Sequence, residues 1–211
     1  MSGYDRHTRA RVLKVAARLF AERGFRKVTV RDICTAADAN VAAVNYHFRD
    51  KMGLYREVLE DAIGLIRAGD AAEMAGAAGS AEDRFRAHIQ AYLHRLLVQG
   101  GDSWVHRLVY HEIAEPTPVL DRIVEHAFRP RVEYLCGLVG EILQCDPADA
   151  RVRRSVASIQ AQCVMLLPHP IGDRLRPRAR RTPAEIDQLA RHIADFSLAG
   201  IRAVGRPHAG R

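Results

Sequence analysis

Residues 29–55 read TVRDICTAADANVAAVNYHFRDKMGLY and decide the fold of the N-terminal part of the chain. Thr29 followed by Asp32 forms a helix-capping pair, so a short helix is predicted from Val30 to Ala37. Asn40 is a favourable N-cap for a second short helix from Val41 to His47. Asp50 caps a further helix that starts at Lys51 and continues into the 60s. The pattern is therefore helix, three-residue break, helix.

This arrangement is typical of a helix-turn-helix, whose second helix enters the major groove of DNA. Val44 and Phe48 lie four residues apart and are expected to face the core. Asn45 can read adenine through paired hydrogen bonds, while the Tyr46 hydroxyl and the Lys51 ammonium can contact phosphates. The backbone amides at the start of the next helix add an anion site. The predicted DNA-contacting residues are Arg31, Asn40, Val41, Ala42, Asn45, Tyr46, His47 and Lys51.

Positive charge is concentrated in the same part of the chain. Of 211 residues, 32 are Lys or Arg and 25 are Asp or Glu, a net charge of +7. Residues 1–55 hold eleven of the basic and five of the acidic residues, a net charge of +6, and the remainder carries +1. A basic module on a nearly neutral body favours a polyanionic partner such as nucleic acid, although a solvated basic surface is the alternative.

Apolar residues elsewhere recur at helical spacing, and strand signals are nearly absent. Residues 9–23 carry such a stripe, which Gly24 ends. Further helices are predicted over residues 51 to the 60s, 80–97, 104–114, 121–128, 132–143, 152–167 and 182–204. An arginine-rich loop is expected at 174–181. The predicted class is all-α with about nine helices, and the predicted domains are a DNA-binding domain at 1–55 and a larger helical domain at 56–211.

Three segments in the N-terminal region resemble the TetR/AcrR family of bacterial transcription regulators. They are AARLFAERGF at 16–25, TVRDI at 29–33 and VNYHFRDKMGLY at 44–55. The resemblance implies a homodimer that binds a palindromic operator, most often as a repressor, and a C-terminal cavity for a small-molecule effector. The segment EIAEPTP at 112–118 is similar to one in a branch linked to antibiotic and efflux responses. The family more often has Gly at Asp38, Thr at Ala43 and Tyr at Asn45, which affects the individual base and phosphate assignments.

Two apolar stripes are compatible with such a dimer. Residues 152, 156, 159, 163 and 166, and residues 186, 189, 193, 196 and 200, follow alternating spacings of three and four. Two helices from each subunit would form a four-helix interface through the last two helices. The alternative is that both stripes serve only the core of one subunit.

The effector pocket is predicted from polar, aromatic or polarisable residues on otherwise apolar helices. The candidates are Trp104, Leu108, His111, Cys136, Gln160 and Met165. The alternative is an ordinary core with a few satisfied polar groups.

Other classes of protein lack support in the sequence. No nucleophile-elbow, phosphate-loop or dinucleotide-binding motif occurs, so we expect no enzymatic activity and no cofactor. The ten histidines and four cysteines lack metal-ligand spacing, and the cysteines are expected to be free thiols in the cytoplasm. Neither a transmembrane stretch nor a secretory signal is apparent. A second hypothesis is an all-α small-molecule-binding protein that reads no specific operator.

Overall fold

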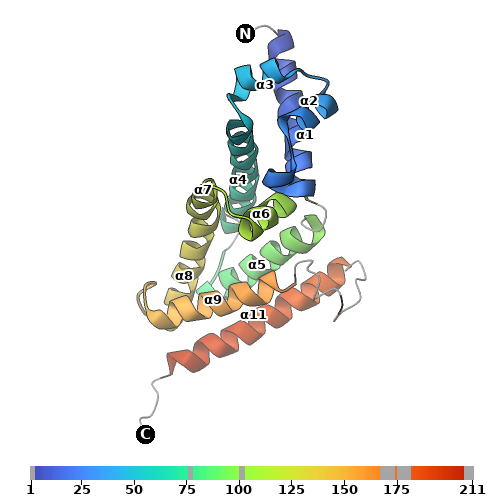
Figure 1. Ribbon diagram of the computed structural model, residues 1–211. Helices are drawn as coiled ribbons and strands as arrows, with labels where there is room; N and C mark the ends of the chain where they lie inside the picture. The colour runs from blue at the N-terminus through green and yellow to red at the C-terminus, as the bar shows by residue number, and fades with distance from the viewer. Residues whose placement is uncertain (1–2, 76–77, 100–102, 167–173, 175–181, 207–211) are drawn as a thin grey trace. The chain divides into compact units, whose positions relative to one another are not determined.

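The computed structural model describes residues 3–75, 78–99, 103–166, 174 and 182–206 (Figure 1). Within these ranges the protein contains helices and no strand, which confirms the all-α prediction. No helix in the described part of the chain is long and apolar enough to span a membrane. Apart from Arg174, the predicted arginine-rich loop lies outside the described residues.

The chain forms two compact units that interleave in sequence. The first comprises Met1–Arg67 and Asp102–Ala127, and the second comprises Ala68–Gly101 and Phe128–Arg211. The domain boundary predicted after residue 55 falls inside α4, an uninterrupted helix from Lys51 to Ala75. The first unit therefore holds more of α4, together with α6 and α7, than the sequence-based domain did.

The first unit contains α1 (Gly3–Lys27), α2 (Val30–Ala37), α3 (Val41–Phe48), the first part of α4, α6 (Trp104–Ala114) and α7 (Leu120–Ile123). The backbone of α1 leaves helical geometry at Gly24, with φ 79°, as the glycine predicts. A Cβ at Gly24 would lie 3.1 Å from Nδ1 of His111, so this glycine also permits close contact with α6.

Local sequence sets the two short helices. The Thr29 side chain accepts from the backbone of Asp32, whose carboxylate in turn accepts from Thr29 N at 2.8 Å. Asp38 ends α2 in the left-handed conformation, with φ 46° and ψ 56°. Asn40 then caps α3 by accepting from Ala43 N at 2.7 Å. The predicted helix-turn-helix is therefore confirmed, with α3 extending one residue beyond its predicted end.

An aromatic cluster forms part of the core of the first unit. The Tyr55 ring on α4 lies 4.9 Å from Phe20 and 4.7 Å from Phe25 between ring centroids. Phe20 and Tyr55 are at most 1% exposed. The start of α4 is therefore packed directly against α1.

The second unit packs α5 (Ala81–His94), α8 (Arg129–Leu143), α9 (Ala150–Val164) and α11 (Pro183–Gly205) around one apolar core. Ser80 with Asp83 and Thr182 with Glu185 form capping boxes that start α5 and α11. Two π-helical segments interrupt the α-helical pattern: η1 (Arg95–Gln99) lies in this unit, whereas η2 (Val124–Phe128) lies in the first unit except for Phe128. The helix predicted over 121–128 is accordingly divided into α7 and η2.

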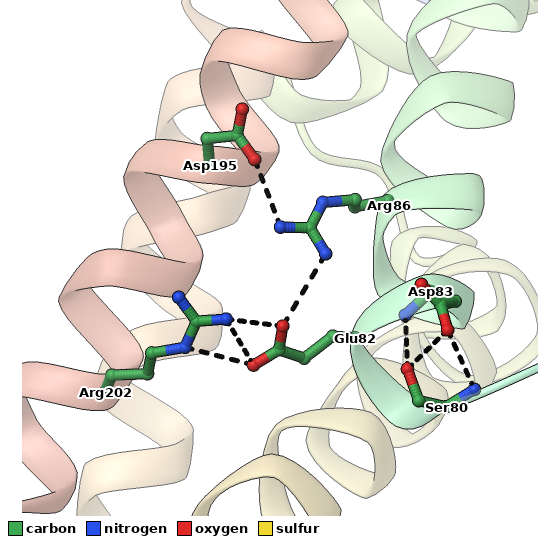
Figure 2. A network of polar contacts seen from close by, with 6 residues as sticks. All are labelled: Ser80, Glu82, Asp83, Arg86, Asp195 and Arg202. Atoms are coloured by element: carbon green, nitrogen blue, oxygen red, sulfur yellow. Dashed lines mark hydrogen bonds and ion pairs between the residues drawn. The ribbon is translucent and has the colours of Figure 1, made fainter.

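Polar contacts join α5 to α11 across the surface of this unit. Figure 2 shows the Arg202 guanidinium on Glu82, with Nε donating to Oε1 at 3.0 Å. Arg86 bridges Glu82, at 3.6 Å, and Asp195, at 3.2 Å. Exposed pairs of this kind contribute little individually, so the buried apolar core supplies most of the attachment.

The predicted stripe on α9 lies inside the subunit. Val152, Val156, Ile159 and Cys163 are all at most 2% exposed, because this face of α9 covers α8 and α11. On α11, Ile186 and Ile193 are also buried, whereas Phe196 is 64% exposed. Six of the ten stripe positions are therefore buried within one chain, whereas Phe196 and Gly200 on α11 stay exposed.

Candidate DNA-binding interface

Helix α3 has one buried and one exposed face. Val44 and Phe48 are 0% and 2% exposed, which confirms the side predicted to face the core. On the other side Ala42 and Asn45 are exposed, and the exposed fractions of Val41 and Tyr46 are 46% and 74%. The Tyr46 side chain, which is large, rigid and amphipathic, is therefore available to a partner.

The end of α3 is held in a strained turn. Arg49 has φ 71° and ψ −53°, and Asp50 N donates to Phe48 O at 2.9 Å, which defines a γ-turn with positive φ. Asp50 Oδ1 then accepts from Gly53 N at 2.7 Å and so caps α4. This conformation is costly for a residue other than glycine, and strained backbone of this kind concentrates at functional sites.

Close backbone contact fixes α3 against α4. A Cβ placed on Gly53 would lie 2.0 Å from the carbonyl oxygen of Phe48, far inside van der Waals contact. Only glycine therefore permits this approach between the last turn of α3 and the first turn of α4. The Asp50 carboxylate already accepts from the amide of Gly53 at the start of α4, so the anion site expected there stays a prediction.

Two arginines of α1 support α3 and the turn that precedes it. Arg9 pairs with Glu57 of α4, and its guanidinium lies 5.4 Å from the Phe48 ring centroid. Arg11 Nη2 donates to the carbonyl of Asp38 at 2.7 Å and so holds the turn between α2 and α3. Sequence reasoning counted both arginines only as part of the basic surface, because partners this distant in sequence carry no local signal.

The remaining predicted DNA-contacting residues lie on α2, in α3 or at its start, and on α4. Arg31 is exposed in the first turn of α2. His47 is half-buried, with its ring 5.1 Å from that of Tyr46. The Lys51 ammonium lies 4.2 Å from the Phe25 ring centroid, and burial lowers the pKa of Lys51 while Asp32 partly opposes this effect. The Asn40 side-chain oxygen caps α3 by accepting from Ala43 N. The same oxygen would be needed to accept a hydrogen bond from a base.

The six predicted pocket residues fall in both units. Trp104, Leu108 and His111 belong to α6 in the first unit, with Leu108 fully buried. Cys136 and Gln160 are half-buried on α8 and α9 of the second unit, and Met165, just beyond α9, is 61% exposed. A pocket lined by these six residues stays a prediction. Among the described residues, no group of His, Cys, Asp and Glu side chains is arranged to hold a metal ion.

The geometry defines a helix-turn-helix DNA-binding protein joined to a larger helical domain. Residues 12–58 match the family model of the bacterial regulatory proteins of the tetR family. Residues 81–201 match the C-terminal domain of the HTH-type transcriptional dual regulator CecR. The chain therefore belongs to the TetR family of DNA-binding transcriptional regulators, with a C-terminal domain of the CecR type.

Individual relatives agree with this assignment. The HTH-type transcriptional repressor KstR2 of Rhodococcus jostii is 45% identical over 51 residues, which are 24% of this chain and 25% of that protein. The chain thus matches only about a quarter of this curated relative.

Two solved structures share the whole fold. A crystal structure of a Pseudomonas aeruginosa PAO1 protein has a TM-score of 0.72 at 20% identity, covering 98% of this chain and 96% of that chain. The structure of AibR in complex with isovaleryl coenzyme A and operator DNA has a TM-score of 0.66 at 19% identity, covering 90% and 97%. At such identities the likeness concerns the fold alone.

Proposed function

We propose that this protein is a ligand-responsive repressor that binds a palindromic operator as a homodimer and is released by a small-molecule effector. The observation that carries the proposal is the exposed face of α3, with Asn45 and Tyr46 presented by a helix that caps and backbone contacts hold in place. Two such helices in a dimer would read successive major grooves about one helical turn apart. The structurally similar AibR was solved in complex with isovaleryl coenzyme A and operator DNA, so a protein of this fold can bind both a small molecule and an operator.

The test is fluorescence anisotropy on the DNA upstream of the protein's own gene, with a shuffled fragment as control, across a salt series. The proposal expects the native fragment to bind about 10³-fold more tightly than the shuffled one. Equal and steeply salt-dependent binding to both fragments would mean that only phosphates are contacted. That result would favour the second hypothesis, a small-molecule-binding protein without a specific operator.

Two substitutions in α3 separate base reading from phosphate contact. Asn45→Ala is expected to weaken operator binding by about 1–3 kcal/mol and to relax sequence preference. Tyr46→Ala is expected to weaken binding to all sequences, because a phosphate contact carries no base information. Tyr110→Ala is the matched control, since Tyr110 is a 58% exposed tyrosine on α6. If both α3 variants titrate the operator like the parent protein and the Tyr110→Ala control, α3 is not the recognition helix.

The proposed dimer uses the outer faces of α9 and α11. Val164 on α9 and Phe196 and Val204 on α11 are 51%, 64% and 40% exposed, so these helices offer apolar side chains to a second copy. A groove of about 520 Å³ runs between the two helices and is lined by Ser155, Ser158 and Gly200 among others. The small residues permit close approach of a second copy. The face of α9 that carries the two serines differs from the face that carries the buried stripe.

A charge at the centre of this face is expected to dissociate the dimer. Phe196→Glu would bury an unpaired carboxylate in the interface, at a cost of several kcal/mol. Sedimentation equilibrium should therefore show monomers for Phe196→Glu and dimers for the parent. Ile113→Glu on α6, where Ile113 is 60% exposed, is the control and should remain dimeric. A dimeric Phe196→Glu variant would place the interface elsewhere.

A further inference from the structure

Charged and polar side chains meet inside the second unit, in a region that the DNA-binding function does not use. They come from the end of α4, from α5, from η1 and from α8. We call this group the polar cluster, and its members are Asp70, Glu73, His88, Tyr92, Arg95, Arg131 and Tyr134. Charges are rarely buried in a domain of this size unless they are paired or serve a function.

The two acidic members of the cluster share one close arginine. The side chains of Asp70 and Glu73 are 7% and 9% exposed. Arg95 forms an ion pair with each of them, and its Nε lies 2.7 Å from Oε1 of Glu73. Arg131 is the second cation of the cluster, so the two carboxylates are balanced by two guanidiniums and no unpaired acid is offered to a cationic ligand.

Arg131 is the more loosely paired of the two cations. It is 9% exposed, and its nearest carboxylate oxygen, on Asp70, is 3.8 Å from Nη1, beyond hydrogen-bond length. The guanidinium otherwise lies between two rings, 4.8 Å from the centroid of Tyr92 and 5.5 Å from that of Phe128. Asp70 thus engages the N–H donors of Arg131 only weakly, which leaves them able to meet a further acceptor.

His88 is a buried polar side chain without a hydrogen-bond partner among the described residues. It is 1% exposed, and neither ring nitrogen has a hydrogen-bond partner in the described part of the chain. Its ring stacks on Tyr92, with centroids 6.1 Å apart, and lies 5.3 Å from Tyr134. Burial, with smaller contributions from Arg131 and Arg95, lowers the pKa of His88 to about 4. At neutral pH the ring is therefore uncharged, with one donor and one acceptor to offer.

Backbone geometry marks the same place independently. Arg95 lies in η1 and Phe128 in η2, so each π-helical segment supplies one residue that contacts the cluster or its arginine. π-Helical turns are rare and are frequent at functional sites, where they redirect side chains.

We propose that the polar cluster is the effector site and that it takes a small aromatic carboxylate. The carboxylate would accept hydrogen bonds from the guanidinium of Arg131, which suits this planar, two-oxygen acceptor. The ring of the ligand would lie against Tyr92, and a ring substituent would satisfy His88. This inference rests on the proposed function for its regulatory meaning, but the binding itself does not depend on DNA.

Benzoate and 4-hydroxybenzoate are suitable probes, with benzamide as a neutral control of the same shape. Calorimetric titration of the full-length protein without DNA should show binding of both carboxylates and none of benzamide. 4-Hydroxybenzoate should bind more tightly, because its hydroxyl can pair with His88. Absence of binding by either carboxylate overturns the proposal.

Variants locate the site. Arg131→Met is expected to weaken carboxylate binding about 10- to 100-fold, the range for a hydrogen bond to a charged group. Arg86→Met, which removes a half-exposed arginine from α5, is the control and should bind like the parent. His88→Phe keeps the ring and removes both nitrogens, so it should abolish the preference for 4-hydroxybenzoate and serves even if Arg131→Met fails to fold. Unchanged binding in Arg131→Met, or an unchanged preference in His88→Phe, contradicts the assignment.

Operator anisotropy on the same preparations keeps the two proposals apart. Operator binding without ligand tests the proposed function alone. Release of the operator by 4-hydroxybenzoate from the parent, but not from Arg131→Met, supports the effector role. A ligand that binds without changing operator affinity overturns that role, because an effector must bind the two states with different affinity.

Discussion

Gly53→Ala is expected to destabilise the protein by about 1–3 kcal/mol or more, because the new methyl group overpacks a backbone contact. The added Cβ would lie 2.0 Å from Phe48 O, and neither backbone can yield as a flexible side chain could. Either α3 or α4 must shift, so the operator affinity of the folded fraction should fall as well. Urea denaturation and operator titration measure the two effects.

The matched control is Gly64→Ala on the same helix. Nothing lies within 4 Å of a Cβ at Gly64, which is exposed in the middle of α4. Replacing an exposed helical glycine by alanine is expected to leave the protein unchanged or to stabilise it by up to about 1 kcal/mol. Similar stability changes at the two positions would show that helix propensity, and not the contact with α3, determines the effect of Gly53→Ala.

This pair of glycines also shows where sequence reasoning stops. Both occupy the same predicted helix, and nothing adjacent to either one reports the proximity of Phe48 O. By contrast, the limits of α2 and α3 were predictable, because Thr29, Asp38 and Asn40 act on neighbours within four residues. Capping and turn chemistry are local, whereas close approach between helices depends on tertiary packing.

The polar cluster had a weak signal in the sequence. His88 falls three residues after Phe85 and one before Ile89, inside the apolar stripe of α5, so a polar residue on a buried face could have been noticed. The pairing of Arg95 with Asp70 and Glu73 could not have been predicted from the sequence, since it joins η1 to α4. The exposed face of α9 could not be predicted for a related reason. Spacing identifies an apolar stripe but not what covers it.

Glu112→Leu is the second substitution with a large expected effect. Glu112 is 1% exposed and accepts hydrogen bonds from Tyr55 Oη at 2.6 Å, Thr117 N at 2.7 Å and Thr117 Oγ1 at 2.8 Å. Leucine would leave these donors without an acceptor, at about 1–3 kcal/mol for each one that stays buried. The expected loss is therefore about 3 kcal/mol or more, measured by urea denaturation.

Glu115→Leu provides the control on the end of the same helix. The Glu115 side chain is 52% exposed and pairs with Arg26 at 3.6 Å, so its removal should change stability by less than about 1 kcal/mol. Since Tyr55 is on α4 and Glu112 on α6, Glu112→Leu should also loosen α6 from the start of α4. Equal stability of the two variants would mean that the Glu112 contacts are not formed in solution.

The pH dependence of stability isolates the Tyr55 hydroxyl within this network. Burial, and then the hydrogen bond to Glu112 and its charge, raise the pKa of Tyr55 above the ordinary value of 10.0. The folded state therefore holds this proton more tightly than the unfolded chain does. The stability from this group is fully present below about pH 10 and is lost above it, at about 1.4 kcal/mol per pH unit.

Tyr55→Phe should be less stable than the parent by about 1.5–3 kcal/mol at neutral pH, because a buried carboxylate loses a donor. Phenylalanine has no proton to lose, so the variant lacks this part of the alkaline decline. The gap between the two proteins should consequently narrow as the pH rises above about 10, although other buried tyrosines titrate in both. Urea denaturation from about pH 8 to pH 11 measures this difference in stability. A constant difference would mean that folding does not change the pKa of Tyr55.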